Sequence, residues 1–322
     1  MAVYTKINYK DVLILSANFK LGKIIKFQGI KKGIENTNYL LSTNKNKYIL
    51  TIFEKRVQRK ELPFFMKLMD QLYKKKINCP KPLKDKNGNY LTLVKNKAAC
   101  IVTFLNGKDK PNLDSKNCNE VGKNIGKLHR ASRKIKLYRN NSMSIDNLGS
   151  LLKSIKFKSK KIDANLKSVL KTNLKEIKKE WPTNLPRGII HGDLFIDNIF
   201  FKKNKFAGFI DFYFSSNDYL MYEIAICINA LCFDIKKNKY VLNNKKVKNL
   251  IKGYQNVRKI SKKEKNALNI LCRGAALRYL LTRIYDYFNT PKTALVKIKD
   301  PKEYFQKLIF HNNLNNYKDY YK

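Results

Sequence analysis

The first part of the chain alternates short runs of apolar and β-branched residues with clusters of turn residues. This pattern is typical of short strands joined by tight turns. The predicted strands cover residues 23–30, 37–43, 48–54, 90–94 and 98–105. Polar residues at 44–47 predict one hairpin turn, and Asn87 with Gly88 predicts a second. This region is therefore expected to form an antiparallel sheet.

Two stretches of the same region have helical spacing instead. One covers residues 11–19 and the other covers residues 61–76, which end before Pro80. In the second, apolar residues recur at three- and four-residue intervals, as on one face of a helix. A helix is therefore expected between the third and fourth strands.

Beyond the last of these strands the pattern is mostly helical. The predicted helices cover residues 114–134, 163–181 and 219–233. Ser261 and Glu264 form a capping box that opens a longer helix, reaching about residue 288. Asn106 and Gly107 end the final strand and predict a hinge.

The order of these elements predicts two lobes in an α+β fold. Residues 1–106 would form a small, antiparallel β-rich lobe, and residues 107–322 a larger, mainly helical lobe. A small β-rich lobe joined by a hinge to a helical lobe is the layout of protein-kinase-like folds.

Composition adds a large positive charge to this picture. The chain has 68 Lys and Arg against 24 Asp and Glu, a formal net charge of +44. Of the basic residues 58 are Lys, scattered among Asn, Ile and Tyr in every segment. Nucleic-acid-binding proteins concentrate basic residues on one element and often use Arg. We therefore expect a solvated basic surface and no specific nucleic-acid partner, with a basic RNA-binding protein as an alternative.

The cysteines and the apolar runs indicate the cellular compartment in which the protein is expected. The six cysteines form no C-x-x-C pair and have no His at zinc spacing, which favours reduced thiols. The residues after Met1 are not a basic-then-apolar leader, and the longest apolar run, near 222–233, is too short to span a bilayer. We expect a cytoplasmic protein outside the membrane, and the sequence predicts no oligomeric state.

One stretch interrupts the helical pattern with polar residues between short apolar runs. His191, Gly192 and Asp193 form an H-G-D motif, Asn198 follows, and Asp211 comes in a predicted strand at 207–212. A carboxylate on a loop can accept the proton of an attacking hydroxyl, while amide and carboxylate oxygens suit Mg²⁺ that bridges ATP phosphates.

The motif therefore predicts an ATP-dependent phosphotransferase. Asp193 would be catalytic, Asn198 and Asp211 would bind Mg²⁺, and His191 would support the loop. The alternative is that these are ordinary turn and cap residues. Gly192 stands where protein kinases carry Arg, and the triplet that begins at Asp211 lacks the Gly of D-F-G, which favours a small-molecule acceptor.

The segment at 29–39 lies between two predicted strands and is the candidate loop over the ATP phosphates. Its proposed contacts are Gly33, Ile34, Asn36 and Asn38. A plain hairpin is the alternative. On the phosphotransferase interpretation, residues 1–106 bind the nucleotide, and the catalytic and metal-binding loops belong to residues 107–322.

These motifs resemble the homoserine kinases built on the aminoglycoside-phosphotransferase-like fold, which are unrelated to the GHMP-type homoserine kinases. The likeness is carried by GIENTNYLL at 33–41, YILTIFEKRV at 48–57, HGDLFIDNIFF at 191–201, GFIDFYFSSNDYLMYEIAICINALCF at 208–233 and RGAALRYLLTRIYDYFNTP at 273–291. The resemblance implies transfer of phosphate from ATP to L-homoserine, giving O-phospho-L-homoserine in threonine biosynthesis. One departure is Thr51, where kinases of this fold carry a Lys that pairs with an acidic residue such as Glu61; Lys55 and Arg56 are candidate substitutes.

Arg is scarce in this chain, which makes each Arg a candidate for carboxylate recognition. Arg273, Arg278 and Arg283 fall on one predicted helix. At about 100° per residue, Arg273 and Arg283 lie about 80° apart while Arg278 is about 140° from each and should face elsewhere. We therefore expect Arg273 and Arg283 to bind the acceptor's carboxylate and Asp218 its ammonium group. The alternatives are that these Arg join helices to acidic residues and that Asp218 caps a helix.

Other acceptors on the same fold remain competing interpretations. Choline and aminoglycosides are cations and need acidic or aromatic pockets, whereas homoserine carries both an ammonium and a carboxylate group; a methylthio-sugar is a further alternative. A non-catalytic nucleotide-binding protein is a competitor from another class, against which the complete set of Asp193, Asn198 and Asp211 argues.

Overall fold

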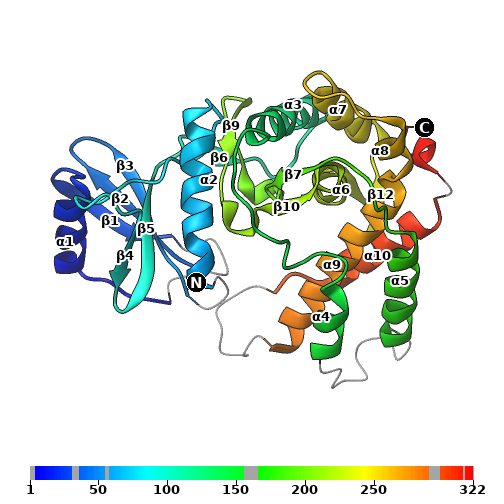
Figure 1. The fold of residues 1–322 in the computed structure, drawn as a ribbon, viewed down its shortest axis with the longest axis horizontal. Coiled ribbons are helices and arrows are strands. Elements are labelled where there is room, and N and C mark those ends of the chain that lie inside the picture. Colours follow the sequence, from blue (N-terminus) through cyan, green and yellow to red (C-terminus); the bar gives the residue numbers. More distant parts are fainter. Residues whose placement is uncertain are drawn as a thin grey trace. The chain divides into compact units, whose positions relative to one another are not determined.

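The computed structural model describes residues 4–30, 36–54, 58–155, 166–289, 298–314 and 316–321 (Figure 1). Contacts group these residues into two compact units. The first contains the chain up to Gly107 together with Ala207–Tyr213, and the second contains the rest of the described chain. The predicted boundary lies at residue 106, and residues 207–213 are the part of the first unit that comes from later in the sequence.

The first unit is built on a five-stranded antiparallel sheet. Its strands are β1 (Ile24–Gly29), β2 (Thr37–Thr43), β3 (Lys47–Ile52), β4 (Leu91–Val94) and β5 (Lys97–Thr103), in the order β1-β2-β3-β5-β4. Leu41, Leu50 and Ile101 are buried with Val12 and Phe19 of helix α1 (Tyr9–Phe19). The predicted strands and their antiparallel pairing are confirmed, because alternating side chains give the sheet one face to bury.

Both helices predicted for this unit are confirmed, as α1 and α2, and the turn predicted at Asn87 and Gly88 is present, although no described strand leads into it. Helix α2 (Leu62–Lys74) follows a 3₁₀ turn, η1 (Arg59–Glu61). Strands β4 and β5 are joined at Lys95 and Asn96, whose φ angles are 49° and 62°. Asn87 and Gly88 form a separate turn before β4. A two-residue hairpin needs positive φ at both positions, and a Lys-Asn pair is a weaker signal for it than Asn-Gly.

The second unit is mainly helical (Figure 1). Its helices are α3 (Ser115–Ser132), α4 (Leu148–Ser154), α5 (Leu166–Glu180), α6 (Leu220–Leu231), α7 (Asn244–Gln255), α8 (Lys262–Asn266), α9 (Leu268–Asn289) and α10 (Pro301–Asn312). Helix α6 is apolar on all sides, and nearly all of its residues are buried, as expected of a core helix. Helices α3 and α7 approach closely: a Cβ on Gly122 would lie 1.9 Å from the Leu250 carbonyl oxygen.

The predicted helices correspond to α3, α5 and α6, although residues 163–165 lie outside the described chain. The capping box of Ser261 and Glu264 is present, but the long helix is divided at Ala267 into α8 and α9. Helices α4, α7 and α10 were not predicted. No described helix is both long enough and apolar enough to cross a bilayer.

Short strands enclose the H-G-D loop. Strand β7 (Arg187–Ile190) pairs antiparallel with β10 (Ser216–Tyr219), and β8 (Ile199–Lys202) pairs with β6 (Lys108–Asp109). The segment at 191–198, including η2 (Ile196–Asn198), is therefore anchored at both ends by paired strands. A hairpin of β11 (Phe233–Lys236) and β12 (Lys239–Leu242) follows α6.

Candidate active site

A buried carboxylate holds the main chain of the H-G-D loop. Glu223 of α6 has no exposed surface and accepts hydrogen bonds from the backbone N–H groups of His191 and Gly192, the latter at 3.1 Å. Burial raises the pKa of Glu223, but its contacts with His129 and His191 outweigh burial, so the net pKa is lowered and the group is ionised at neutral pH. Hydrogen bonds to a charged acceptor are stronger than neutral ones. Glu223 therefore fixes the backbone next to Asp193.

A buried histidine lies behind this carboxylate. His129 of α3 is fully buried; its Nδ1 atom is 2.8 Å from the Tyr254 hydroxyl, and its Nε2 atom is 3.9 Å from the Glu223 carboxylate. Burial lowers the pKa of His129. Burial therefore favours the neutral form of the ring, while the Glu223 carboxylate acts in the opposite direction.

The glycine of the motif is required by the backbone. Gly192 has a φ of 79°, and a Cβ at this position would lie 2.9 Å from the Phe214 carbonyl oxygen. An Arg, as in protein kinases, would clash there. His191 is buried, and its carbonyl lies 3.4 Å from the Ser215 hydroxyl that donates to it. The role of the His191 side chain in supporting the loop remains a prediction.

Asp193 and Asn198 lie together. A catalytic loop in which both act on the same substrates requires this. The Nδ2 atom of Asn198 donates to the Asp193 carbonyl at 2.8 Å and to its carboxylate at 3.1 Å. The hydroxyl of Tyr279, on α9, donates to the Gly192 carbonyl at 3.0 Å and lies 3.5 Å from the Asp193 carboxylate. Phe195 packs edge-on against Tyr279, with ring centroids 4.8 Å apart. The Asp193 carboxylate is thereby held in one orientation by two elements.

Asp211 belongs to the first unit. Strand β9 (Lys205–Phe209) ends three residues earlier than its predicted end at 212, so Asp211 follows the strand instead of lying in it. Its φ of 65° is uncommon for a residue with a side chain and is typical of turns and functional sites. Behind it, the ring of Tyr213 packs edge-on against Phe53 and Phe65, at 5.0 and 5.8 Å. The buried aromatic residues fix the backbone that presents the exposed Asp211 carboxylate.

Asn198 and Asp211, the two predicted Mg²⁺ ligands, each offer an oxygen atom and belong to different units. Since Nδ2 of Asn198 faces Asp193, its Oδ1 atom is directed away and is free of that contact. Asp211 supplies a carboxylate. Among the described residues no three His, Cys, Asp or Glu side chains form a metal-holding cluster. Mg²⁺ is commonly held by one or two protein ligands together with substrate phosphates, so each of these oxygens is of a type that Mg²⁺ accepts. Their role as metal ligands remains a prediction.

The predicted nucleotide contacts are only partly described. Gly33 and Ile34 lie outside the described residues, as do Lys55 and Arg56. Asn36 is buried, and its Oδ1 atom has no hydrogen-bond partner within the described chain. Asn38 of β2 accepts a hydrogen bond from Thr51 of β3 at 2.8 Å.

Two of the Arg residues of α9 are paired with acidic residues of neighbouring helices. Arg273 lies 2.9 Å from Glu176 of α5, and Arg283 lies 2.7 Å from Glu303 of α10. Arg283 also donates to the Asp300 carbonyl at 2.8 Å. These ion pairs agree with the alternative that the two Arg join helices, and their role in acceptor binding is not tested by the structure.

Asp218 and Arg278 are both buried. Asp218 accepts from the Nδ2 atom of Asn141 at 2.6 Å and from the backbone N–H of Tyr219 at 2.7 Å. Arg278 is 3% exposed, and its guanidinium carbon lies 4.7 Å from the centre of the Tyr279 ring. Arg278, which was expected to face away from Arg273 and Arg283, is thus the Arg that lies over Tyr279, a residue that contacts the H-G-D loop.

Sequence reasoning missed three residues of this site: Glu223, Tyr279 and Arg278. A signal existed for Glu223, which is the only acidic residue in the otherwise apolar α6. A lone acidic residue in such a helix must be buried with a partner. Tyr279 gave no comparable signal, because it meets the loop only through tertiary packing. Arg278 gave none either, because it is linked to the loop only through Tyr279.

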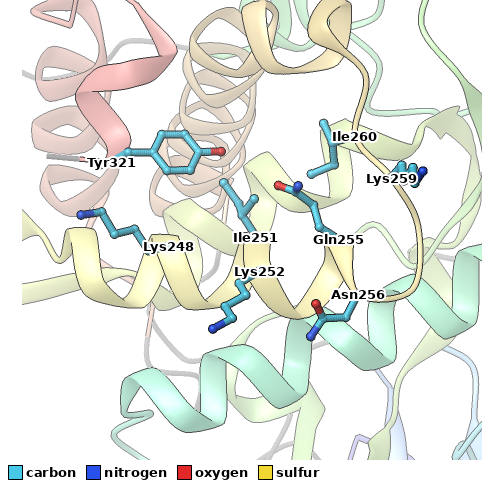
Figure 2. A pocket seen from close by; sticks show the side chains of 8 residues that line it. All are labelled: Lys248, Ile251, Lys252, Gln255, Asn256, Lys259, Ile260 and Tyr321. Atoms are coloured by element: carbon cyan, nitrogen blue, oxygen red, sulfur yellow. The ribbon is translucent and has the colours of Figure 1, made fainter.

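The pocket shown in Figure 2 is separate from this site. It has a volume of about 590 Å³ and lies against α7, the segment that follows it and Tyr321 of η4 (Tyr317–Tyr321). Lys248, Lys252 and Lys259 line it together with apolar and amide side chains. None of its lining residues belongs to the H-G-D loop, so we do not assign it to catalysis.

A protein-family model described as the phosphotransferase enzyme family matches residues 26–241. Together with the fold, this match and the relatives described next define the class: an ATP-dependent phosphotransferase with an alcohol acceptor. A homoserine kinase of Agrobacterium fabrum is 41% identical over 320 residues, covering 99% of this chain and 98% of that protein. A homoserine kinase of Rhizobium meliloti is 40% identical over 311 residues, covering 97% and 94%. The chain belongs to the homoserine kinases of this phosphotransferase family.

Solved structures with low sequence identity share the fold. An amicoumacin kinase in complex with AMP-PNP, Ca²⁺ and its ligand superposes with a TM-score of 0.70 at 12% identity, covering 95% of this chain and 92% of that one. A choline kinase from Streptococcus pneumoniae gives a TM-score of 0.62 at 14% identity, covering 95% and 98%. These likenesses confirm the predicted protein-kinase-like fold.

Proposed function

We propose that this enzyme transfers the γ-phosphate of ATP to the side-chain hydroxyl of L-homoserine, giving ADP and O-phospho-L-homoserine for threonine biosynthesis. The observation that carries this proposal is the 41% identity with a homoserine kinase over nearly the whole of both chains. The orientation of Asp193 by Asn198 and Tyr279 supports it from the structure. We place the reaction in the cytoplasm.

Asp193 acts on the acceptor hydroxyl. As the hydroxyl oxygen bonds to the γ-phosphorus, its proton passes to the Asp193 carboxylate, and the bond to the oxygen shared with ADP breaks. The contacts with Asn198 and Tyr279 hold that carboxylate in place before the reaction, which removes an orientational cost from the barrier. Glu223 supports the same loop from behind through its backbone amides.

Asn198 Oδ1 and the Asp211 carboxylate would hold a divalent cation, which we propose to be Mg²⁺. A bound cation neutralises charge on the ATP phosphates. The proposed nucleotide site lies in the lobe of residues 1–106, where Gly33, Ile34, Asn36 and Asn38 belong to the loop over the phosphates. The buried Oδ1 atom of Asn36 supports a polar ligand at that loop.

A panel of acceptors tests this proposal. ATP consumption by the purified enzyme would be measured with homoserine, serine, choline, a methylthio-sugar and an aminoglycoside. The expected result is a kcat/KM for homoserine at least about a hundredfold above the others, because one missing charged contact costs about 2–3 kcal/mol. A higher kcat/KM for any other acceptor would contradict the assignment.

A further inference from the structure

Arg278 is a buried cation whose guanidinium group is only partly paired. Within the described chain its hydrogen-bond partner is the Tyr222 hydroxyl, while its Nε and Nη1 atoms have none. Arg273 and Arg283, on the same helix, each contact a carboxylate within 3 Å. No described carboxylate forms such an ion pair with Arg278. Burying a charged donor without an acceptor is costly, so this group is suited to an anion from outside the chain.

Arg278 lies close enough to the proposed catalytic loop for an anion bound to it to be part of a substrate. Its guanidinium group stacks on the ring of Tyr279, and the hydroxyl of the same ring contacts Gly192 and Asp193 of the catalytic loop. Burial lowers the pKa of Arg278, but Tyr279, Tyr222 and Asp193 together raise it, which places the Asp193 carboxylate within electrostatic reach. One aromatic ring thus separates the unpaired cation from the proposed base.

We propose that Arg278 binds the carboxylate of the acceptor substrate, an inference that rests on the proposed homoserine kinase function. A guanidinium group donates two parallel hydrogen bonds to a carboxylate, either from Nε and Nη2 or from Nη1 and Nη2. Each of these pairs includes one of the two Arg278 atoms that have no hydrogen-bond partner. Homoserine carries its hydroxyl and its carboxylate on the same short carbon chain. A substrate whose hydroxyl reaches Asp193 therefore brings its carboxylate into the same neighbourhood, on the side of α9.

Arg278 is assigned to the acceptor and not to the ATP phosphates. Tyr222 of α6 and Tyr279 of α9, the two side chains that contact its guanidinium group, both belong to the second unit. The proposed phosphate loop and Asp211 belong to the first unit. Both anions would satisfy the guanidinium chemically, so the test must separate them.

The test uses the conservative variant Arg278→Lys, which keeps the charge and loses the two-pronged geometry. Steady-state KM would be measured for homoserine and for ATP, along with kcat/KM for 3-aminopropan-1-ol, which is homoserine without its carboxylate. The expected result is a rise of about 30- to 100-fold in the KM for homoserine, the KM for ATP within about twofold, and an unchanged kcat/KM for 3-aminopropan-1-ol. Arg278→Gln should give the larger rise.

The matched control is Arg258→Lys. Arg258 also lies over a tyrosine ring, that of Tyr254, but pairs with Glu264 at 2.8 Å, so its KM values should equal the parent's. An equal or larger rise in the KM for ATP would assign Arg278 to phosphate and overturn the proposal. An equal loss with 3-aminopropan-1-ol would make Arg278 a positioning residue for Asp193 and would also overturn it. A parent enzyme inactive on homoserine would instead refute the proposed function itself.

Discussion

At the scale of single residues, the proposed chemistry depends on the Asp193 carboxylate. Asp193→Asn keeps the shape and the contact with Tyr279 but cannot accept the proton of the acceptor hydroxyl. We expect kcat to fall by about 10²- to 10⁴-fold while ATP binding, measured by titration calorimetry, stays within about twofold. Asp197→Asn is the control, because Asp197 is a nearby half-exposed carboxylate that pairs with Lys299 at 3.6 Å. Turnover of Asp193→Asn near that of the parent would remove Asp193 from the base role.

Asp211 has a different predicted role, as a metal ligand. Asp211→Ala removes one of two proposed oxygen donors, so we expect metal-dependent ATP binding and activity to be lost together. The measurement is an ATP-binding titration at several Mg²⁺ concentrations. Full activity of this variant at ordinary Mg²⁺ would show that the metal assignment is wrong.

Glu223 links stability to pH. Glu223→Gln removes a buried charged acceptor from the amides of His191 and Gly192, and we expect the free energy of unfolding to fall by about 1.5–3 kcal/mol and kcat to fall about tenfold. Because the folded-state pKa of Glu223 is lowered from its ordinary value of 4.5, its stabilisation is present above that pH and is lost as the pH falls below it. The difference between parent and variant in denaturant unfolding should therefore shrink below pH 4.5. A difference that stays constant with pH, or is absent at neutral pH, would contradict this role.

At the scale of elements, the spacing of apolar residues predicted those helices and strands that form one continuous, regularly patterned segment. The strands of the first unit and the helices α2, α3 and α6 follow directly from alternating or helical spacing. The failures have physical causes as well. Strand β7 is only four residues long, and its partner β10 is distant in sequence, so the pair depends on tertiary contact. Helices α7 and α10 have apolar positions at helical spacing, but frequent Lys and Asn obscured them.

The hairpin turns carry a sequence signal that was not recognised, a Lys-Asn pair, and its effect on stability can be tested. The turns after β4, β8 and β11 all use a Lys-Asn pair with positive φ at both positions; in the last, Lys237 and Asn238 have φ of 46° and 59°. Asn-Gly suits this geometry better. We expect Lys237→Asn combined with Asn238→Gly to raise the free energy of unfolding by about 0.5–1 kcal/mol, measured by thermal or denaturant unfolding. Lys236→Asn, in the adjoining strand, should give no gain. Destabilisation by the paired change would show that the native side chains make contacts that outweigh backbone strain.

At the scale of the whole molecule, the sequence predicted the fold class and the catalytic loop but not the supports around it. The H-G-D motif and Asn198 are close in sequence, and their spacing was enough to predict that Asp193 and Asn198 lie together. Glu223 and Arg278 lie about 30 and 85 residues later in the chain, and only packing of α6 and α9 brings them to the loop. The role of Arg273 and Arg283 stays a prediction. Angles around one helix do not reveal which of its residues comes near the H-G-D loop, and Arg278 is the one that lies over Tyr279.

The central claim is that phosphate moves from ATP to the homoserine hydroxyl with Asp193 as the base, and product analysis tests it most directly. Purified enzyme would be incubated with ATP, Mg²⁺ and L-homoserine, and the products followed by ³¹P NMR and mass spectrometry, beside the Asp193→Asn variant. The account predicts a phosphomonoester on the homoserine side-chain oxygen, formed in equal amount with ADP, and almost none with the variant. Release of inorganic phosphate with homoserine unmodified, or equal ester formation by the variant, would contradict it.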